Sequence, residues 1–292
     1  MALATLIAPG ALGNGDIAEF RDRMDAAGLT TGNLAWIDAA DAADVSLSGD
    51  LSVAHRAAEP MRGRLDIVIQ QVGPRRKALL VSDMDSTMIT VECIDELADY
   101  AGIKPQVAAI TERAMRGELD FGGALRERVK LLAGLDVAVI DRCLTERVRP
   151  MPGAATLVAT MRGWGAWCLL VSGGFTAFTE SVARSLGFDA QRANILGIES
   201  GRLDGTVAAP IVDSGMKRDL LFQAAADRAV ATDAILAVGD GANDIPMIAA
   251  AGLGVAYHAK PKAREAAAGI IDHADLSALL WVQGVRRADW VR

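Results

Sequence analysis

One segment near the first third of the chain reads Ala78-Leu79-Leu80-Val81-Ser82-Asp83-Met84-Asp85-Ser86-Thr87. It opens with a short continuous apolar run, which is typical of a parallel strand buried on both faces. Two acidic residues, Asp83 and Asp85, follow that run directly. Carboxylates at the end of a buried strand are costly unless a cation neutralises them. The segment therefore predicts a parallel sheet with a charged site at its edge.

Three further apolar runs lie downstream, at residues 167–171, 235–238 and 253–256. Helical periodicity separates them, most clearly over residues 175–186 and 217–227. Strands that alternate with helices require crossover connections, which predicts an α/β fold with a doubly wound parallel sheet. In such sheets the ligand lies beyond the carboxyl ends of the strands, so the residues after each strand are the candidate site.

Polar and glycine-rich sequences follow the later strands as well. The second strand is followed by Ser172-Gly173-Gly174, a hydroxyl and free N–H groups that suit a phosphate. The third is followed by Gly239-Asp240-Gly241-Ala242-Asn243-Asp244, and Lys217 opens a helix where its cation could meet a phosphate. Paired carboxylates with a phosphate favour Mg²⁺, which binds oxygen ligands. Each signal alone also fits an ordinary turn or helix cap.

The remaining segments predict two additions to this core. Residues 92–152 are helical in pattern and interrupt the core at its ligand edge, as a cap over a site would. Residues 1–74 follow the order β-α-β-β-α-β of a small ferredoxin-like α+β domain. Between that domain and the core at 75–292, residues 72–77 combine chain breakers with three cations and are interpreted as a solvated linker.

Composition limits the classes of partner. Lysine and arginine number 30 against 37 aspartates and glutamates, a net charge of −7, which argues against a nucleic-acid or anionic membrane surface. No apolar run approaches the length of a membrane span. Three scattered cysteines without paired spacing indicate buried thiols in a reducing compartment, and hence a cytoplasmic protein.

In this order, the DMDST, VSGG, Lys217 and GDGANDIPM motifs resemble the haloacid dehalogenase (HAD) superfamily of phosphatases with an aspartate nucleophile. The resemblance runs from about Leu79 to the C-terminus. It is sharpest toward the branch that hydrolyses phosphoserine, because Glu92 follows the first motif and Arg128 lies in the cap stretch DFGGALRERV.

The resemblance implies an aspartyl-phosphate mechanism in the last step of serine biosynthesis, with the following roles. The nucleophile would be Asp83 and the general acid/base Asp85, with Mg²⁺ held by Asp83, the Asp85 main-chain carbonyl and Asp240, and phosphate bound by Ser172, Gly173, Lys217 and Asn243. The ammonium and carboxylate of O-phosphoserine would meet Glu92 and Arg128 beside an apolar wall of Met115 and Phe121, with Thr87 and Asp244 in support.

Two alternatives remain open from the sequence. A related enzyme of the same superfamily could pass the phosphoryl group to an alcohol such as homoserine instead of water. The N-terminal segment is also similar to ACT domains, which would make it an amino-acid sensor or the contact of a homodimer. It lacks a clear glycine-rich ligand loop, which leaves structural support as the simpler role.

Overall fold

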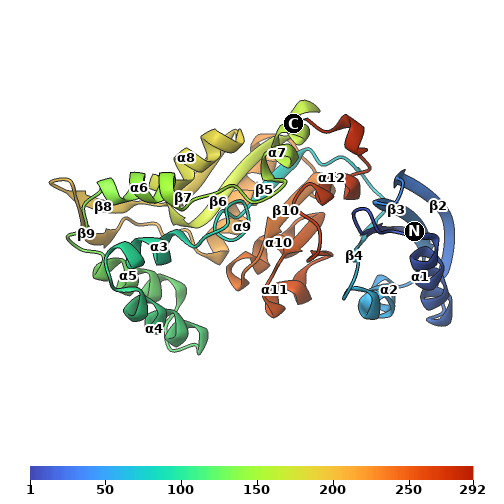
Figure 1. Ribbon diagram of the computed structural model, residues 1–292, viewed down its shortest axis with the longest axis horizontal. Coiled ribbons are helices and arrows are strands. Elements are labelled where there is room, and N and C mark those ends of the chain that lie inside the picture. Colours follow the sequence, from blue (N-terminus) through green and yellow to red (C-terminus); the bar gives the residue numbers. More distant parts are fainter. Residues whose placement is uncertain (292) are drawn as a thin grey trace.

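The computed structural model describes residues 1–291, and its centre is a parallel sheet. Six parallel strands run in the order β12-β11-β10-β5-β6-β7 (Figure 1). Their bounds are β5 Leu79–Ser82, β6 Trp167–Phe175, β7 Ala190–Asn194, β10 Ile235–Gly239, β11 Leu253–Tyr257 and β12 Gly269–Ile271. The predicted parallel α/β core is confirmed.

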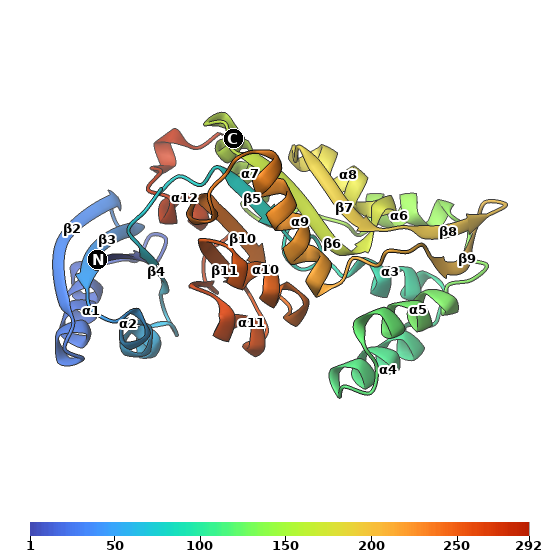
Figure 2. The ribbon, with the colours of Figure 1, turned by 180° about the vertical axis from the view of Figure 1, so that it is seen from behind.

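Helices cover both faces of this sheet, which is why its strands are apolar throughout. On one face, Leu80 packs in the same cluster as α7 (Ala154–Gly163) and α8 (Thr176–Leu186). On the other face, Leu79 and Val81 pack with α9 (Ser214–Asp227), which Figure 2 shows from behind. The shorter helices are α10 Ile245–Ala250, α11 Pro261–Ala266 and α12 Ala278–Val282, with 3-10 turns η1 Glu59–Met61, η2 Thr232–Ala234, η3 Ala242–Asp244 and η4 Arg287–Asp289.

The segment between β5 and α7 is helical, as the sequence indicates. It contains α3 Cys93–Tyr100, α4 Lys104–Met115, α5 Phe121–Leu131 and α6 Ala138–Glu146. A hairpin that the periodicity did not predict, β8 Leu196–Glu199 with β9 Arg202–Val207, extends from the core and contacts these helices. The Gly134 amide, for example, donates to the Leu203 carbonyl at 2.8 Å. The hairpin thereby ties the cap to the core.

The N-terminal module has the predicted element order. Its elements are β1 Ala2–Ile7, α1 Asn14–Ala26, β2 Thr30–Asp38, β3 Ala42–Ser48, α2 Leu51–Ala58 and β4 Asp66–Gln71. The strands are antiparallel in the order β2-β3-β1-β4. Phe20, Met24 and Met61 fill the space between this sheet and its helices. Apolar residues on one face of each element are enough to specify this local packing.

The module is not set apart by a solvated linker, which corrects the interpretation of residues 72–77. Strand β4 pairs antiparallel with β12, so all ten strands form one sheet. Arg75 is paired with Asp44 at 2.8 Å and donates to the Val282 carbonyl at 3.0 Å, while Lys77 is buried. Arg75 binds residues from distant parts of the chain, and Lys77 Nζ donates to the carbonyl of distant Asp233 as well as to that of nearby Pro74. The distant contacts cannot be predicted from the sequence of residues 72–77.

The C-terminal segment closes the same junction. Trp281 of α12 donates its indole N–H to Asp38 of β2's end at 2.7 Å, and the Arg287 amide donates to the same carboxylate. Within residues 1–291, no helix is long and apolar enough to cross a membrane. The core, the cap and the N-terminal module therefore form one continuous body, with the module and the cap at opposite ends (Figure 1).

Candidate active site

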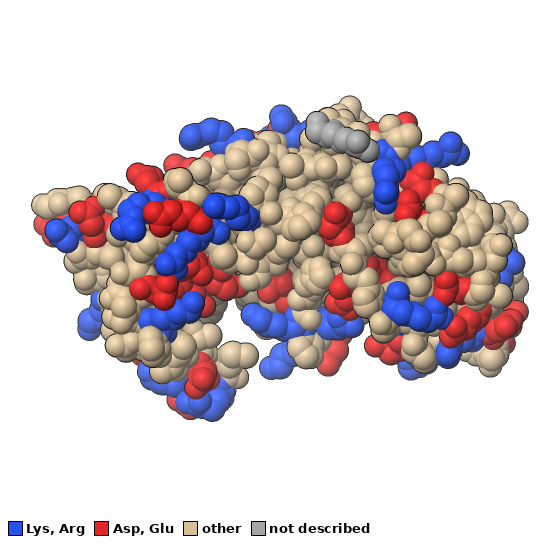
Figure 3. Space-filling view, in the orientation of Figure 1, with Lys and Arg blue, Asp and Glu red and all other residues tan. Residues whose placement is uncertain are grey.

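A cleft of about 520 Å³ lies between the carboxyl ends of the central strands and the cap helices. Figure 3 shows the molecule hollowed at this place. The predicted site residues that line it are Asp83, Asp85, Glu92, Met115, Phe121, Arg128, Ser172, Gly173, Asp240 and Asn243. Thr87, Lys217 and Asp244 lie buried and do not line it. The structure thus brings the predicted residues of four separate segments to one cleft.

A buried cluster of Lys217, Asp83 and Asp244 forms a floor beneath the cleft, and of the three only Asp83 lines it. Lys217 Nζ lies 2.8 Å from Asp83 Oδ1 and 2.7 Å from Asp244 Oδ1, and the lysine is completely buried. Asp83 extends the β5 strand, because its amide donates to the Val238 carbonyl of β10 at 3.0 Å. Asp83 Oδ1 also accepts from the Met84 amide at 2.7 Å. The nucleophile candidate is therefore held by one of its two oxygens.

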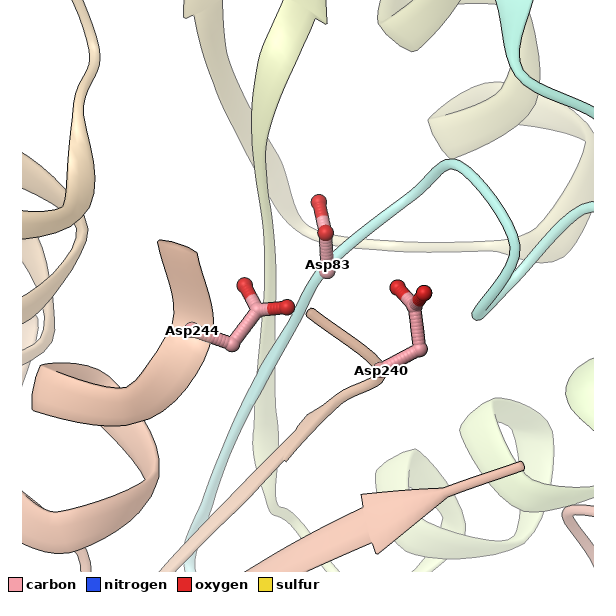
Figure 4. A group of neighbouring side chains, drawn as sticks. All are labelled: Asp83, Asp240 and Asp244. Carbon is pink, nitrogen blue, oxygen red and sulfur yellow. The ribbon is translucent and has the colours of Figure 1, made fainter. Parts of the chain in front are cut away.

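Three carboxylates meet at this floor, those of Asp83, Asp240 and Asp244 (Figure 4). One oxygen of each lies within 4.8 Å of the others. Burial, followed by Asp244, raises the pKa of Asp83 well above its ordinary value, and burial with Asp244 raises the pKa of Asp240 to about 6. Burial opposes charge on Lys217, but Asp244 and Asp83 outweigh it and raise the pKa of the lysine. The single positive charge of Lys217 does not balance three carboxylates, so the cluster has excess negative charge.

That excess fits a divalent cation bound through oxygen atoms. Both oxygens of Asp244 already have partners, because Oδ1 pairs with Lys217 and Oδ2 accepts from the Gly241 amide at 3.0 Å. Asp240 has more distant partners than Asp244: Thr87 Oγ1 lies 3.3 Å from its Oδ1, and Lys260 Nζ lies 4.0 Å from its Oδ2. Asp83 and Asp240 are therefore the side chains with the most capacity for a metal ion.

Asp85 lies on the cap side of the same loop. Burial first, and then the negative charge of Glu92, raise its pKa to about 7. Its Oδ1 is 3.4 Å from the Cys93 amide at the start of α3. A methyl group on Gly174 would lie 2.9 Å from its Oδ2, so this glycine leaves room for the carboxylate. A carboxyl group with a pKa near 7 can both donate and accept a proton.

The phosphate-binding candidates lie at the end of β6. Ser172 and Gly173 belong to the strand, which continues to Phe175, rather than to a separate turn before the helix. The Ser172 hydroxyl oxygen accepts from the Gly174 amide at 2.8 Å, which leaves its proton available to an anion. Gly173 lies against the Phe121 ring, where a Cβ would approach within 2.9 Å. Asn243 is half-buried in the loop after β10.

The cap contributes a second, mixed wall. Glu92 precedes α3 and Arg128 lies in the last turn of α5. Burial lowers the pKa of Arg128, and the nearby carboxylates of Asp95 and Glu92 oppose that change. Phe121 is half-buried at the start of α5, whereas Met115 at the end of α4 is 74% exposed. The apolar wall is therefore formed more by Phe121 than by Met115.

Three residues in or behind the cleft were not predicted. Asp95 lines it one helical turn after Glu92, and the i, i+3 spacing within one helix was the available signal. Lys260 lines it from the loop after β11, and its Nζ lies 4.0 Å from Asp240 Oδ2. Ser86, within the DMDST motif, donates its hydroxyl proton to Glu92 Oε1 at 2.6 Å.

A family model of haloacid dehalogenase-like hydrolases matches residues 77–252, and the chain belongs to this family. Two similar proteins are named as phosphoserine phosphatases. A phosphoserine phosphatase of Polaromonas sp. is 47% identical over 207 residues, which are 69% of this chain and 88% of that protein. A phosphoserine phosphatase of Streptomyces coelicolor is 45% identical over 227 residues, 77% of this chain but only 55% of the longer relative.

The whole arrangement recurs in a solved structure. The crystal structure of a probable phosphoserine phosphatase from Vibrio cholerae, in unliganded form, matches with a TM-score of 0.79 and 34% sequence identity. The match covers 99% of this chain and 88% of that one. It therefore includes the N-terminal module as well as the core and the cap.

Proposed function

We propose that the protein hydrolyses O-phosphoserine to serine and phosphate through an aspartyl-phosphate on Asp83. The observation that carries the proposal is the way Asp83 is held. Its Oδ1 is bound by Lys217 and the Met84 amide, while among the hydrogen bonds of residues 1–291 none ends on Oδ2. A carboxylate anchored by one oxygen at the floor of a cleft is arranged to attack phosphorus with the other.

Asp85 supplies the proton transfers of the two displacements. When Asp83 attacks, the bond between phosphorus and the serine oxygen breaks, and Asp85 donates its proton to that oxygen. The Asp85 carboxylate then takes a proton from the water that attacks the aspartyl-phosphate, which releases phosphate and restores both aspartates. A pKa of about 7 suits both tasks near neutral pH.

The cleft can stabilise the phosphoryl group from two sides. Ser172 has a hydroxyl proton to donate, Gly173 and Asn243 line the same cleft, and Lys217 is fixed beneath it by Asp244. Donors that are already oriented stabilise charge as it develops on the phosphoryl oxygens. Mg²⁺ would be held by Asp83, Asp240 and the Asp85 main-chain carbonyl, and it would withdraw charge from those oxygens.

The cap wall suits the amino-acid end of the substrate. Glu92 supplies a carboxylate for the ammonium group, and Arg128 supplies a guanidinium that can bind the carboxylate at two points. The Polaromonas and Streptomyces relatives are named for the same substrate. Transfer to an alcohol is the rival outcome, and products formed in the presence of homoserine distinguish the two acceptors.

A substrate panel tests the proposal. With Mg²⁺ present, phosphoserine should be hydrolysed with a kcat/KM at least about tenfold above that of an aryl phosphate, since two charged contacts are gained. Arg128→Lys should reduce the value for phosphoserine and leave the aryl phosphate nearly unchanged, because lysine cannot make the two-point contact. Equal rates on all phosphate esters in the wild-type protein would refute the specific function.

Metal binding can be tested without activity. Mg²⁺ that binds only the folded protein stabilises it, so adding the ion after chelation should raise the Tm, and the Tm should rise further with Mg²⁺ concentration. Asp240→Asn should abolish most of that shift, whereas Asp272→Asn, a carboxylate outside the cleft paired with Arg264, should keep it. A wild-type Tm that does not respond to Mg²⁺ would contradict a metal site here.

For assembly and location we propose a homodimer formed through the N-terminal module, in the cytoplasm. Strand β2 is the outer edge of the sheet, and it carries partly exposed Leu34 and Trp36 without lysine, arginine or proline. Such an edge can pair with a second copy. Trp36→Lys should convert a dimer to a monomer in sedimentation experiments, and a monomeric wild type would contradict the pairing.

The proposed location in the cytoplasm is supported by the three cysteines, which are free and buried, as suits a reducing compartment.

A further inference from the structure

Ser86 has an unusual backbone conformation for a residue with a side chain. It lies between Asp85 and Thr87, and its φ of +55° places it in the left-handed region. That conformation brings Cβ close to the following carbonyl oxygen, so glycine is the residue that adopts it most easily. A serine at such a position, in the loop that carries the nucleophile, calls for a side-chain explanation.

The hydroxyl of Ser86 supplies one. It donates a hydrogen bond of 2.6 Å to Oε1 of Glu92, six residues later. The backbone supports the same geometry, because the Ser86 amide donates to the Val91 carbonyl at 3.4 Å and closes the loop. Glu92 lines the cleft, whereas Ser86 does not. The serine hydroxyl is therefore linked to a bound substrate through Glu92.

We propose that Ser86 is a positioning residue that fixes the Glu92 carboxylate for the ammonium group of the substrate. This inference rests on the proposed function of Glu92. A glutamate side chain has three rotatable bonds, and ordering them when the substrate binds would reduce affinity. The hydrogen bond to Oε1 orders the carboxylate beforehand and leaves Oε2 for the ammonium. Selectivity for an amino-containing phosphate ester thus depends on a hydroxyl that never touches it.

Removing the hydroxyl should affect amino-containing substrates selectively. For Ser86→Ala, kcat/KM with phosphoserine and with phosphoethanolamine should fall about tenfold, mainly through KM, as expected for a hydrogen bond to a charged group. The same constant for an aryl phosphate, which has no ammonium, should change less than about twofold. Equal losses on all three substrates would show a general disturbance of the loop and would overturn the proposal.

Ser86→Gly separates the hydroxyl from the backbone conformation. Glycine adopts the positive φ without strain, so this variant should keep the wild-type Tm and still lose the selectivity of Ser86→Ala. Full phosphoserine activity in Ser86→Gly would show that the hydroxyl is not needed. Thr90→Ala is the matched control, since this exposed residue belongs to the same loop. It should leave kcat/KM unchanged for phosphoserine and for the aryl phosphate.

A double-mutant cycle with Glu92→Gln tests whether Ser86 acts through Glu92. Glu92→Gln alone should lower kcat/KM for phosphoserine and spare the aryl phosphate. In that background, adding Ser86→Ala should change phosphoserine activity less than about twofold. Independent, multiplicative losses would overturn the proposal for Ser86 alone. A Glu92→Gln protein with unchanged phosphoserine activity would overturn the role of Glu92 and the inference together.

Discussion

At the scale of single residues, the site is built on unequal surroundings for chemically identical groups. Asp83 and Asp244 share Lys217, whereas Asp85, two residues after Asp83, faces Glu92. The first pair is fixed by a cation, and the third carboxyl group has a pKa raised to about 7 by burial and by a negative neighbour. Differences of this kind allow one aspartate to act as a nucleophile and another as an acid.

The pH dependence should follow Asp85. In the proposed mechanism its protonated form donates to the leaving oxygen, and that form is lost as the pH rises through about 7, so kcat/KM for phosphoserine should decrease above this pH. An aryl phosphate has a leaving group that needs no proton, and its profile should lack the decrease. Matching decreases for both substrates would assign the titration to another group.

Part of this residue-level arrangement could be predicted. The carboxyl ends of neighbouring parallel strands meet at one edge, so Asp83, Ser172 and Asp240 were expected together. The partners Ser86 and Lys260 were not, because neither side chain has a sequence pattern that reveals its contact. Hydrogen bonds within a tight loop depend on backbone angles that the sequence shows only where glycine or proline enforces them.

At the scale of secondary-structure elements, close packing positions the loop after β10. Gly254 of β11 lies against α10, where an added Cβ would be 2.1 Å from the Ile248 carbonyl oxygen. That contact is with backbone, which cannot rotate away. Helix α10 begins directly after Asp244, the partner of Lys217. The absence of a side chain at Gly254 therefore allows α10 to pack where it places Asp244 next to Lys217.

Gly254→Ala tests this packing. It should reduce the free energy of unfolding by about 1–3 kcal/mol, the usual cost of overpacking, and lower kcat because α10 and Asp244 move. Urea denaturation and steady-state kinetics measure the two effects. Gly63→Ala is the control, since an added Cβ there meets nothing within 4 Å. Unchanged stability in Gly254→Ala would mean that α10 can shift freely.

The elements themselves were largely predictable, although β7, β12 and one hairpin were not predicted. Continuous apolar runs identified β5, β6, β10 and β11, because both faces of those strands are buried. The hairpin β8–β9 was missed: Ile198 is 55% exposed and only Leu196 and Leu203 are buried, so its strands show little alternation. Strands that pack mainly on a neighbouring cap carry a weak signal in their own sequence.

At the scale of the whole molecule, the N-terminal module is joined to the core by the pairing of strands β4 and β12 and by a side chain beside it. Asp66 of β4 accepts hydrogen bonds from the amides of Asp272 and Ala274, at 2.7 and 2.8 Å, next to the pairing of β4 with β12. This contact joins residues about 200 positions apart. The module was recognisable from local patterns, but nothing local in residues 66–71 reveals which strand they would pair with.

Calorimetry tests whether the module and core unfold together. Asp66→Ala leaves buried N–H groups without an acceptor and should cost about 2 kcal/mol, which lowers the Tm by several degrees. Because the sheet is continuous, the protein should keep a single transition that moves as a whole. Asp22→Ala, at an exposed position on α1, should leave the Tm unchanged. Two separate transitions in the wild type would contradict a joint unit.

The covalent intermediate is the central claim, and rapid-quench peptide mapping tests it most directly. The protein is mixed with phosphoserine and Mg²⁺, quenched in acid within one turnover, digested and examined by mass spectrometry. The mass of one phosphoryl group should appear on Asp83, and Asp83→Asn should carry none while still unfolding cooperatively as a folded protein. A phosphoryl group on any other residue, or rapid turnover by Asp83→Asn, would contradict the account.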